Sequence, residues 1–600
     1  MFTEIAASAS LTSARPAFIP SIDNRECWNN LDYSIRQQLV HTGELYLDYC
    51  YPQILATDYM EFSRTGNRSN YQEKSFRRRI ALNSLVLAEC TEDRGRFMDD
   101  IINGITLICE ESAWQIPAHN AYIRDTPQFN LPDITRPIID LFAAETAAVL
   151  SVVGTLLRPR LKEVSPFLSG MMEKHLNERI IEPYLKQQFW WMGDGHSQMN
   201  NWTVWCTQNV LLTAFNMELP ADTRQKIVTK ACQSVDYFLD EYGEDGCCDE
   251  GAGYYRHAGL CLFNIMEILN QVTDNAFLDL YREPKIRNIA AYIRNVHVND
   301  LYYINFADCS AVAGRCNARE FLFGKRTGNP ALMAFAAADY KCSEDPLLSE
   351  EQNLYDRLQA IFQYEEITNF KDESLSVPAD CFYESTGLWI ARDNTFCLAV
   401  KAGDNNDSHN HNDTGSFTLY RHGLPMFIDV GVETYTQKTF SPERYELWPM
   451  QSGYHNLLTF DGIMQMDGAK YRSKDVSVSF KDACASISME LSEAYPGHHI
   501  GSYRRNVVFT KNEVITITDT FQSSRKPVVL SLMTYDEPTW HPAECRLQIG
   551  TSGSCRVRGV KAAQTERIPI TDERLALTWK HDIYRTLLTV DGDEIQIKIS

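Results

Sequence analysis

The chain of 600 residues has few basic side chains for its length. Lys and Arg number 57 against 79 Asp and Glu, which gives a formal net charge of −22 at pH 7. A general nucleic-acid binder needs a basic surface, so no nucleic-acid partner is expected. The acidity also argues, more weakly, against a polyanionic ligand. A hydrophobic content of 44% and an aromatic content of 11% exclude a disordered chain and are sufficient for large cores.

The sequence also lacks the marks of export and membrane insertion. Its first residues have an acid at Glu4 and no basic segment before an apolar run, so no secretory signal is predicted. The most apolar segment, Ala143–Leu157, is short for a membrane span and contains Glu145. The 17 cysteines are scattered and odd in number, which favours reduced thiols. We therefore expect a cytoplasmic protein without a membrane partner.

The periodicity of apolar residues changes near residue 375. Before it, apolar residues recur every three or four positions, which predicts these helices: 31–48, 71–88, 96–109, 137–157, 166–181, 203–216, 223–242, 255–271 and 284–297. After it, short alternating runs predict these strands: 395–400, 416–420, 426–430, 456–460, 476–480, 506–509, 514–520, 528–532, 575–579 and 584–590. The predicted fold class is α+β multidomain. An all-α toroid over residues 1–375 precedes an antiparallel β-sandwich over residues 376–600, with Lys371–Ala379 as the linker.

The segment Ser408–Tyr420, SHNHNDTGSFTLY, is the richest in chemically active side chains. His409, His411 and Asp413 alternate, so on an extended strand they would share one face. Each of these residues alone would more often make an ordinary hydrogen bond in a turn or strand. Their combination favours a functional site.

A metal set is predicted from the same region. His411, with Asp429 and His455 downstream, offers two imidazoles and one carboxylate. These are the ligands that divalent transition metals prefer, with a water molecule in the fourth position.

The segment EDGCCDEGAGYYRHAG leads from an acidic, Gly-rich loop into a helix. Tyr254, Tyr255, Arg256 and His257 place a phenol, a cation and an imidazole within one turn. Such a set can move protons beside a carboxylate. A Tyr at a helix start is more often a core residue, so neither Tyr alone would indicate a site.

Two further segments combine polar side chains with tryptophan. In MNNWTVWCTQ, Asn200 and Asn201 precede Trp202 and an apolar helix, which fits either a helix N-cap or a sugar site. Trp114 and His119 lie in a loop between two predicted helices. We interpret these aromatic residues as a groove for carbohydrate rings, with core packing as the alternative.

From about Glu110 to about residue 465, these residues resemble the heparinase II/III-like family of polysaccharide lyases. The resemblance is most specific in SHNHNDTGSFTLYRHGLPMFIDVG, in YHN and in CDEGAGYYRHAG. It implies an α/α toroid joined to an antiparallel β-sandwich, and β-elimination on uronic-acid polysaccharides. In that reaction the uronate carboxylate is neutralised, a base removes the C5 proton and an acid protonates the leaving O4.

The resemblance also implies roles for matching residues. Asn201, with Asn200 beside it, matches the Asn that binds the carboxylate, and Tyr254 matches the catalytic Tyr, with Tyr255 as the alternative. Tyr445 lies about where some relatives place a second catalytic Tyr, and Tyr435 competes with it. The residue patterns and the resemblance together predict three groups of site residues. The catalytic residues are Asn201, Tyr254, His409 and Tyr445, and the substrate-binding residues are Asn200, Trp114, His119, Trp202, Arg256 and Arg444. A structural metal, expected to be zinc, is bound by His411, Asp429 and His455.

Trp202 departs from the family pattern. Several relatives have a His directly after the Asn, where it serves as a base for one substrate stereochemistry. With Trp202 in that place, Tyr254 would perform most of the proton transfer.

Three other functions stay open. A glycoside hydrolase acting on uronic-acid sugars needs two carboxylates, for which Asp249, Glu250 and Asp413 are the candidates. A carbohydrate-binding protein of the same fold would give no product, and a metallohydrolase would use the metal directly. For a lyase, the expected partner is a uronic-acid oligosaccharide or polysaccharide, and the net charge favours a short or weakly sulfated one.

Overall fold

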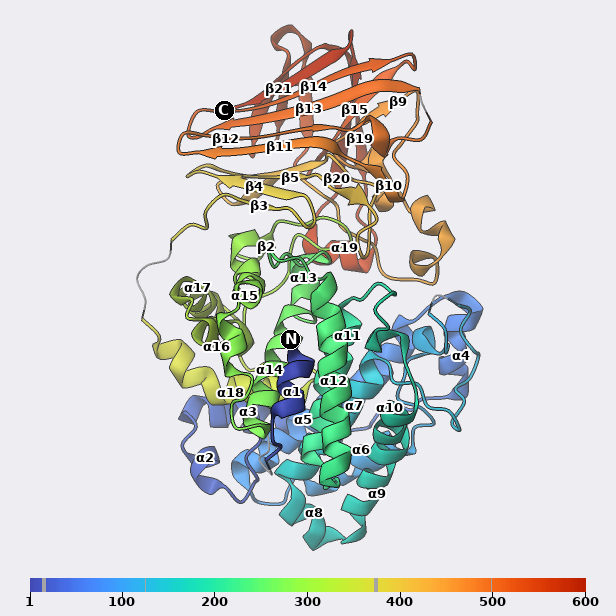
Figure 1. The fold of residues 1–600 in the computed structure, drawn as a ribbon, viewed down its shortest axis with the longest axis vertical. Coiled ribbons are helices and arrows are strands. Elements are labelled where there is room, and N and C mark those ends of the chain that lie inside the picture. Colours follow the sequence, from blue (N-terminus) through green and yellow to red (C-terminus); the bar gives the residue numbers. More distant parts are fainter. Residues whose placement is uncertain (13–17, 125, 372–375, 498) are drawn as a thin grey trace. The chain divides into compact units, whose positions relative to one another are not determined.

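The computed structural model describes residues 1–12, 18–124, 126–371, 376–497 and 499–600, which form two compact units (Figure 1). The first unit contains Met1–Tyr242, Arg256–Ile286 and Arg315–Leu375. The second contains Gly243–Tyr255, Arg287–Gly314 and Ser376–Ser600. Two segments from the helical part of the sequence therefore belong to the unit that carries the sheets. The predicted linker Lys371–Ala379 includes residues 372–375, which lie outside the described residues.

The first unit is built from α-helices. Its helices are α1 Phe2–Ser8, α2 Arg25–Asn29, α3 Tyr33–Glu44, α4 Ala56–Thr65, α5 Ser69–Glu92, α6 Met98–Glu110, α7 Leu141–Leu156, α8 Arg158–Val164, α9 Phe167–Leu176, α10 Glu182–Lys186, α11 Asn201–Asn216, α12 Ala221–Glu241, α14 Gly259–Val272, α16 Ala318–Thr327, α17 Pro330–Lys341 and α18 Leu354–Asn369. A π-helical turn, Asn177–Ile181, joins α9 to α10. α15 (Pro284–Val296) begins in the first unit and ends in the second.

Side-chain caps and burial explain where the central helices lie. Asp140 accepts a hydrogen bond from the amide of Ala143 and caps α7, and Asn353 caps α18 in the same way. α7 packs against α11, and nearly every residue of both helices is buried. Helices buried on all sides are apolar all round, which explains why the sequence of α7 is the most apolar of the chain. Among the described residues, no single helix is long and apolar enough to cross a membrane, although the bent pair α7 and α8 meets both criteria together.

A buried polar network crosses the first unit. Glu145 on α7 accepts hydrogen bonds from Trp205 Nε1 at 3.4 Å and from Asn353 Nδ2 at 3.3 Å. Burial, together with the charges of Glu351 and Asp356, raises the pKa of Glu145 from 4.5 to about 8. The carboxyl group is therefore protonated in the folded protein at neutral pH.

This protonation predicts how stability changes with pH. Between about pH 4.5 and pH 8 the unfolded chain loses a proton that folded Glu145 keeps, so stability falls as pH rises, by at most about 1.4 kcal/mol per pH unit. Glu145→Gln removes this titration. We therefore compare the melting temperatures of the unmodified protein and of Glu145→Gln. The difference, unmodified minus variant, should become smaller or more negative as the pH rises from 5 to 8. A difference that is constant or that grows would show an ionised Glu145 in the folded state.

Antiparallel sheets dominate the second unit. Among the described residues, one sheet has the strand order β11-β12-β13-β14-β21-β18-β17-β16 and the other β19-β20-β15-β8-β7-β5-β4-β3, with β9 paired to β15. The bounds are β3 Cys381–Tyr383, β4 Leu388–Arg392, β5 Phe396–Lys401, β7 Phe417–Arg421, β8 Leu424–Phe427, β9 Leu458–Phe460, β11 Lys474–Lys481, β12 Cys484–Glu490, β13 Ile500–Thr510, β14 Val514–Ser523, β15 Val528–Thr534, β16 Pro538–His541, β17 Arg546–Ile549, β18 Gly553–Arg558, β19 Val560–Ile568, β20 Ile583–Val590 and β21 Glu594–Ile599. The short pairs are β1 (His297–Asn299) with β2 (Tyr302–Tyr303) and β6 (Asp404–Asn405) with β10 (Gly468–Arg472).

The two large sheets share one apolar core. Phe417 and Leu419 of β7 belong to the same buried cluster as Val507 of β13 and Ile597 of β21, and Figure 1 draws the sheets as two layers. Residues alternate between buried and exposed along β12, β13, β17 and β21, as expected for strands with one face on a core and one in solvent. The predicted pattern of an N-terminal helical part followed by antiparallel sheets is confirmed.

One predicted strand is wrong. Of the predicted strand 575–579, residues 575–578 lie in a helix, α19 (Glu573–Thr578). Asp572 starts this helix by accepting hydrogen bonds from the amides of Arg574 and Leu575. The cap therefore outweighs the apolar run that suggested a strand.

Candidate active site

A single buried carboxylate, Asp308, organises the candidate site of the second unit. It receives hydrogen bonds from His409 Nδ1 at 2.8 Å, His411 Nε2 at 3.0 Å, the Tyr435 hydroxyl at 3.1 Å and Arg444 Nη2 at 2.6 Å. Burial opposes ionisation, but the two histidines and the guanidinium outweigh it and hold the pKa of Asp308 well below its ordinary value. Asp308 is not among the predicted site residues, because no local sequence pattern marks it.

The loop that carries the histidines is not a strand. Residues 408–416 have no strand conformation, and His409 has a φ of 56°. The expectation that His409, His411 and Asp413 share one face of a strand is therefore wrong. His409 and His411 instead converge on the two oxygens of one carboxylate, because the loop turns between them.

Interactions with the core hold this loop. The buried Arg505 is paired with Asp519 and also donates to the carbonyl oxygen of Gly415 at 2.6 Å. Gly415 has a φ of 93°, and a Cβ there would lie 2.5 Å from Leu491. Only glycine fits this position, which explains the Gly that follows the HxHxD motif.

Tyr254 reaches the same cluster from α13 (Gly251–Tyr255). Its hydroxyl oxygen lies 2.7 Å from that of Tyr435, and its ring stacks on His409 at 4.9 Å between centroids. Burial raises the pKa of Tyr254, whereas Arg574 and the hydrogen bond with Tyr435 oppose this rise. Gly251 starts the helix with a φ of 81°, where a Cβ would lie 2.6 Å from Cys309.

His409 lies between two acids. Its Nδ1 faces Asp308, and its Nε2 lies 3.4 Å from Glu250, which is also buried. Burial lowers the pKa of His409, but the bond with Asp308 and the charge of Glu250 outweigh it, so the pKa is raised. The raised pKa favours the protonated, positively charged form of the ring, which would stabilise negative charge beside the Tyr254 phenol.

Arg574 is a second site residue that is absent from the predicted set. Its guanidinium lies 4.2 Å from the centre of the Tyr435 ring and donates to the Asp308 carbonyl oxygen at 3.2 Å. Its charge lowers the pKa of Tyr254 against the effect of burial. In the sequence, Asp572 is a possible helix N-cap, and this feature could have placed Arg574 on a helix.

Tyr435 and Tyr445, the two candidates for a second catalytic tyrosine, have different contacts. Tyr435 contacts Tyr254, Asp308 and His409, the last at 3.4 Å from its Nδ1. Tyr445 instead accepts a hydrogen bond from Asn410 Nδ2 at 3.2 Å. Its neighbour Arg444, predicted to bind substrate, is buried and bonded to Asp308 and to the carbonyl oxygens of residues 409, 410 and 439.

The predicted metal residues lie together. One donor atom each of His411, Asp429 and His455 falls within 4.8 Å of the others, and the three side chains are exposed by 0%, 1% and 1%. His411 donates through Nε2 to Asp308, which leaves its buried Nδ1 without a hydrogen-bond partner among the described residues.

The hydrogen bonds of His455 fit a cation at the same place. Its Nε2 donates to the Pro449 carbonyl oxygen at 3.0 Å, and its Nδ1 lies 2.9 Å from Asp429 Oδ2. A neutral His455 then turns a lone pair toward a carboxylate, an arrangement that a metal ion between them would stabilise. Asn456, the next residue, bonds to the carbonyl oxygens of Phe417 and Ile428 and so fixes the segment. The donor set is therefore suited to a divalent metal.

The remaining predicted residues belong to the first unit. Asn200 accepts a hydrogen bond from the amide of Trp202 and is the N-cap of α11, and Asn201 is buried at its first position. Trp202 contacts His119 at 4.5 Å and Trp190 at 5.0 Å between ring centroids. His119 Nδ1 is bonded to Asp140 at 2.8 Å, and burial lowers the pKa of His119, so the ring is neutral.

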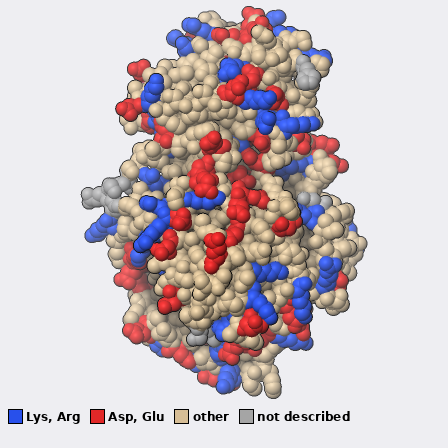
Figure 2. All heavy atoms as spheres, in the orientation of Figure 1, with Lys and Arg blue, Asp and Glu red and all other residues tan. Residues whose placement is uncertain are grey.

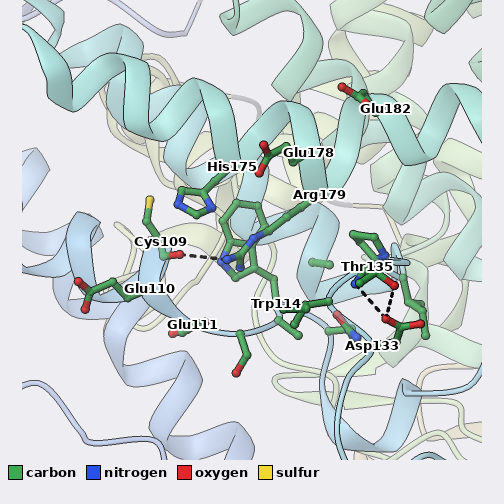
Figure 3. Close-up of a pocket in the computed structure, with 17 residues that line it drawn as sticks. Cys109, Glu110, Glu111, Trp114, Asp133, Thr135, His175, Glu178, Arg179 and Glu182 are labelled. Carbon is green, nitrogen blue, oxygen red and sulfur yellow. Dashed lines mark hydrogen bonds between the residues drawn. The ribbon is translucent and has the colours of Figure 1, made fainter.

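Trp114 and Arg256, both predicted to bind substrate, contact other residues of the chain. Trp114 is buried, donates to the Ile108 carbonyl oxygen and lies 4.6 Å from the guanidinium of Arg179. Trp114 and Arg179 line a cavity of about 610 Å³ between the end of α6 and the π-helical turn (Figure 3). Arg256 Nε lies 3.7 Å from the buried Glu320.

Comparisons with known proteins find a matching family model and similar folds. Residues 378–590 match the family model "Heparinase II/III-like, C-terminal". No curated protein matches the chain in sequence. Among solved structures, heparinase III has a TM-score of 0.62 at 13% identity, with 100% of this chain and 88% of that chain covered. Heparan sulfate lyase HepC (a mutant) from Pedobacter heparinus has a TM-score of 0.60 at 12% identity, with 100% and 87% covered. Chondroitin AC lyase of Streptomyces coelicolor A3, in complex with chondroitin sulphate, has a TM-score of 0.53 at 11% identity, with 100% and 82% covered.

The chain therefore has the fold of these polysaccharide lyases. The resemblance predicted from the sequence is confirmed by the match of residues 378–590 to the heparinase II/III-like C-terminal model.

Proposed function

We propose that the chain is a lyase that cleaves glycans containing uronic acid by β-elimination. The observation that carries this proposal is the pair of phenols, Tyr254 and Tyr435, 2.7 Å apart beside the His409 ring and the Arg574 guanidinium. Elimination needs a group that removes the C5 proton, a group that protonates the leaving O4, and positive charge to stabilise the enolate-like intermediate. The cluster offers all three.

The contacts suggest how the phenols act. Tyr254 would remove the C5 proton, and Arg574 would favour the phenolate by its charge. The bond between the two hydroxyls provides a route for the proton, so that the same pair can protonate O4. Asp308 would hold His409 and Tyr435 in position. The role of Asn201 in binding the carboxylate stays a prediction from the family resemblance.

We further propose that His411, Asp429 and His455 hold a structural zinc ion. Their near-complete burial supports a structural rather than a catalytic metal, because a catalytic ion keeps an open position for substrate or water. When bound, zinc would fix the loop that carries His409. We also propose that the helical unit is the α/α toroid, and the sheet unit the β-sandwich, of the family.

A glycoside hydrolase is the second candidate. Burial and the neighbouring Glu250 raise the pKa of Asp249 to about 7, a value suited to a general acid at neutral pH. A panel of uronate oligosaccharides and polymers separates the two functions. A lyase forms an unsaturated uronate that absorbs in the ultraviolet, whereas a hydrolase cleaves the glycan without new absorbance.

The assignment of the second tyrosine predicts a clear difference between two variants. Tyr435→Phe should lower kcat/KM by about 100-fold or more, because it removes the hydroxyl that contacts Tyr254. Tyr445→Phe is the matched control, since it removes a hydroxyl bonded only to Asn410 among the described residues. We expect it to stay within about threefold of the unmodified chain. A larger loss of kcat/KM in Tyr445→Phe than in Tyr435→Phe would show that Tyr445 is the second catalytic tyrosine.

A further inference from the structure

We propose that the solvent face of the β11–β16 sheet carries a second, non-catalytic site that binds an anionic glycan. The inference rests on the proposed function for the identity of its ligand. The evidence for the site itself is a row of basic side chains that is independent of the catalytic cluster.

The basic row consists of His541, Arg546, Arg556 and Lys598 on four adjacent strands. The register pairs His541 with Arg546, Arg546 with Arg556, and Arg556 with Lys598. Directly opposed residues of antiparallel strands point to the same side of a sheet. Their neighbours Leu547, Val557 and Ile597 are buried, so the row faces solvent. With neighbouring strands about 4.8 Å apart, the row spans about 14 Å.

Among the described residues, only Arg546 of the row forms an ion pair, with Glu544, and the charge of Glu544 also acts on His541 and Arg556. Arg546 is bonded to Glu544 at 2.7 Å, and Glu544 is exposed. The side chains of Arg556 and Lys598 are exposed and make no hydrogen bond or ion pair with any residue that the structure describes. Arg558 lies two positions from Arg556 on the same face and adds to the row. Acidic and basic side chains occur together on the face drawn in Figure 2, so the net charge of −22 does not exclude local basic surfaces.

Stability does not explain the row. Like charges directly opposite on neighbouring strands are destabilising. Charges that protect a sheet from edge-to-edge pairing belong on the edge strand, which here is β16. Arg556 and Lys598 instead lie on the inner strands β18 and β21. A ligand that needs closely spaced cations accounts for this arrangement.

The surroundings of the row favour a glycan. Thr516 lies opposite Lys598, and Gln596, on the same face, donates to the Thr518 hydroxyl at 3.2 Å. Hydroxyl and amide groups beside cations suit an extended chain of sugars that carries carboxylate or sulfate groups. A nucleic acid would also meet the cations, but duplex binding needs a wider basic footprint than this narrow row.

The test measures the binding of a fluorescent heparin oligosaccharide to the full chain by fluorescence polarisation. All variants carry Tyr254→Phe, so that turnover does not consume the probe. We expect Arg556→Glu with Lys598→Glu to weaken binding about tenfold at low salt, and the difference to vanish at high salt. The control, Lys481→Glu with Lys561→Glu, makes the same change in net charge on exposed lysines of β11 and β19 and should bind nearly as the parent does. Equal binding by both double variants would overturn the proposal.

Two further measurements complete the test. Arg556→Glu alone should raise the melting temperature, because it places opposite charges across β18 and β21, yet weaken heparin binding. If this variant binds heparin as the parent does, or if a DNA oligonucleotide of equal charge binds the row as tightly as heparin, the proposal is overturned. Heparin binding by the row without ultraviolet product from any uronate glycan would refute the proposed lyase but not this site. Product formation with unaltered binding by the double variant would refute this site alone.

Discussion

Tyr254→Phe should lower kcat/KM on a uronate glycan by about 10³-fold or more, with the fold intact. The hydroxyl that this change removes bonds to that of Tyr435, and the Tyr254 ring stacks on His409. Among the described residues, Tyr254 is the only tyrosine whose hydroxyl bonds to that of Tyr435. The rate of new ultraviolet absorbance, measured over a range of substrate concentrations, gives the result.

The neighbouring tyrosine supplies the control. Tyr255 is fully buried, its hydroxyl donates to the Ala290 carbonyl oxygen at 3.4 Å, and its ring contacts Tyr292. Tyr255→Phe should therefore affect stability slightly and leave the reaction almost unchanged. A folded Tyr254→Phe variant with normal activity, or a larger loss in Tyr255→Phe, would contradict the assignment.

The second large effect concerns the metal. His411→Ala should lose the bound ion and destabilise the second unit by about 4 kcal/mol or more, because the change opens a buried site and leaves Asp429 unpaired with a cation. His409→Ala should keep the ion, because His409 is outside the donor set, yet lose activity.

Elemental analysis and thermal melts of the two purified variants separate these roles. We expect close to one zinc per chain in His409→Ala and almost none in His411→Ala. Equal loss of metal in both variants would show that His409 takes part in binding the ion, and a full complement in both would remove the proposed site.

Periodicity predicted the class of each region because it reports burial. α5, α7, α11 and α12 are long and have apolar faces that a single sequence displays. The strands of the second unit show the period of two for the same reason. Residues 575–579 were assigned wrongly because an apolar run that short fits either element, and only the Asp572 cap distinguishes them.

The candidate site was only partly predictable. Tyr254, His409 and the metal set stand in motifs whose residue types are unusual together. Asp308 and Arg574 do not, since each is a single charged residue whose partners lie about 100 or more positions away. The loop at His409 was taken for a strand because spacing alone does not reveal a residue with positive φ.

The most direct test of the account is to incubate the metal-loaded chain with a panel of uronate glycans and follow ultraviolet absorbance, with Tyr254→Phe measured in parallel. The account predicts new absorbance with at least one uronate substrate, none with a matched glycan whose uronate carboxyl group is reduced to an alcohol, and almost none with the variant. Cleavage of a uronate glycan without new absorbance, or equal absorbance from the chain and the Tyr254→Phe variant, would contradict it.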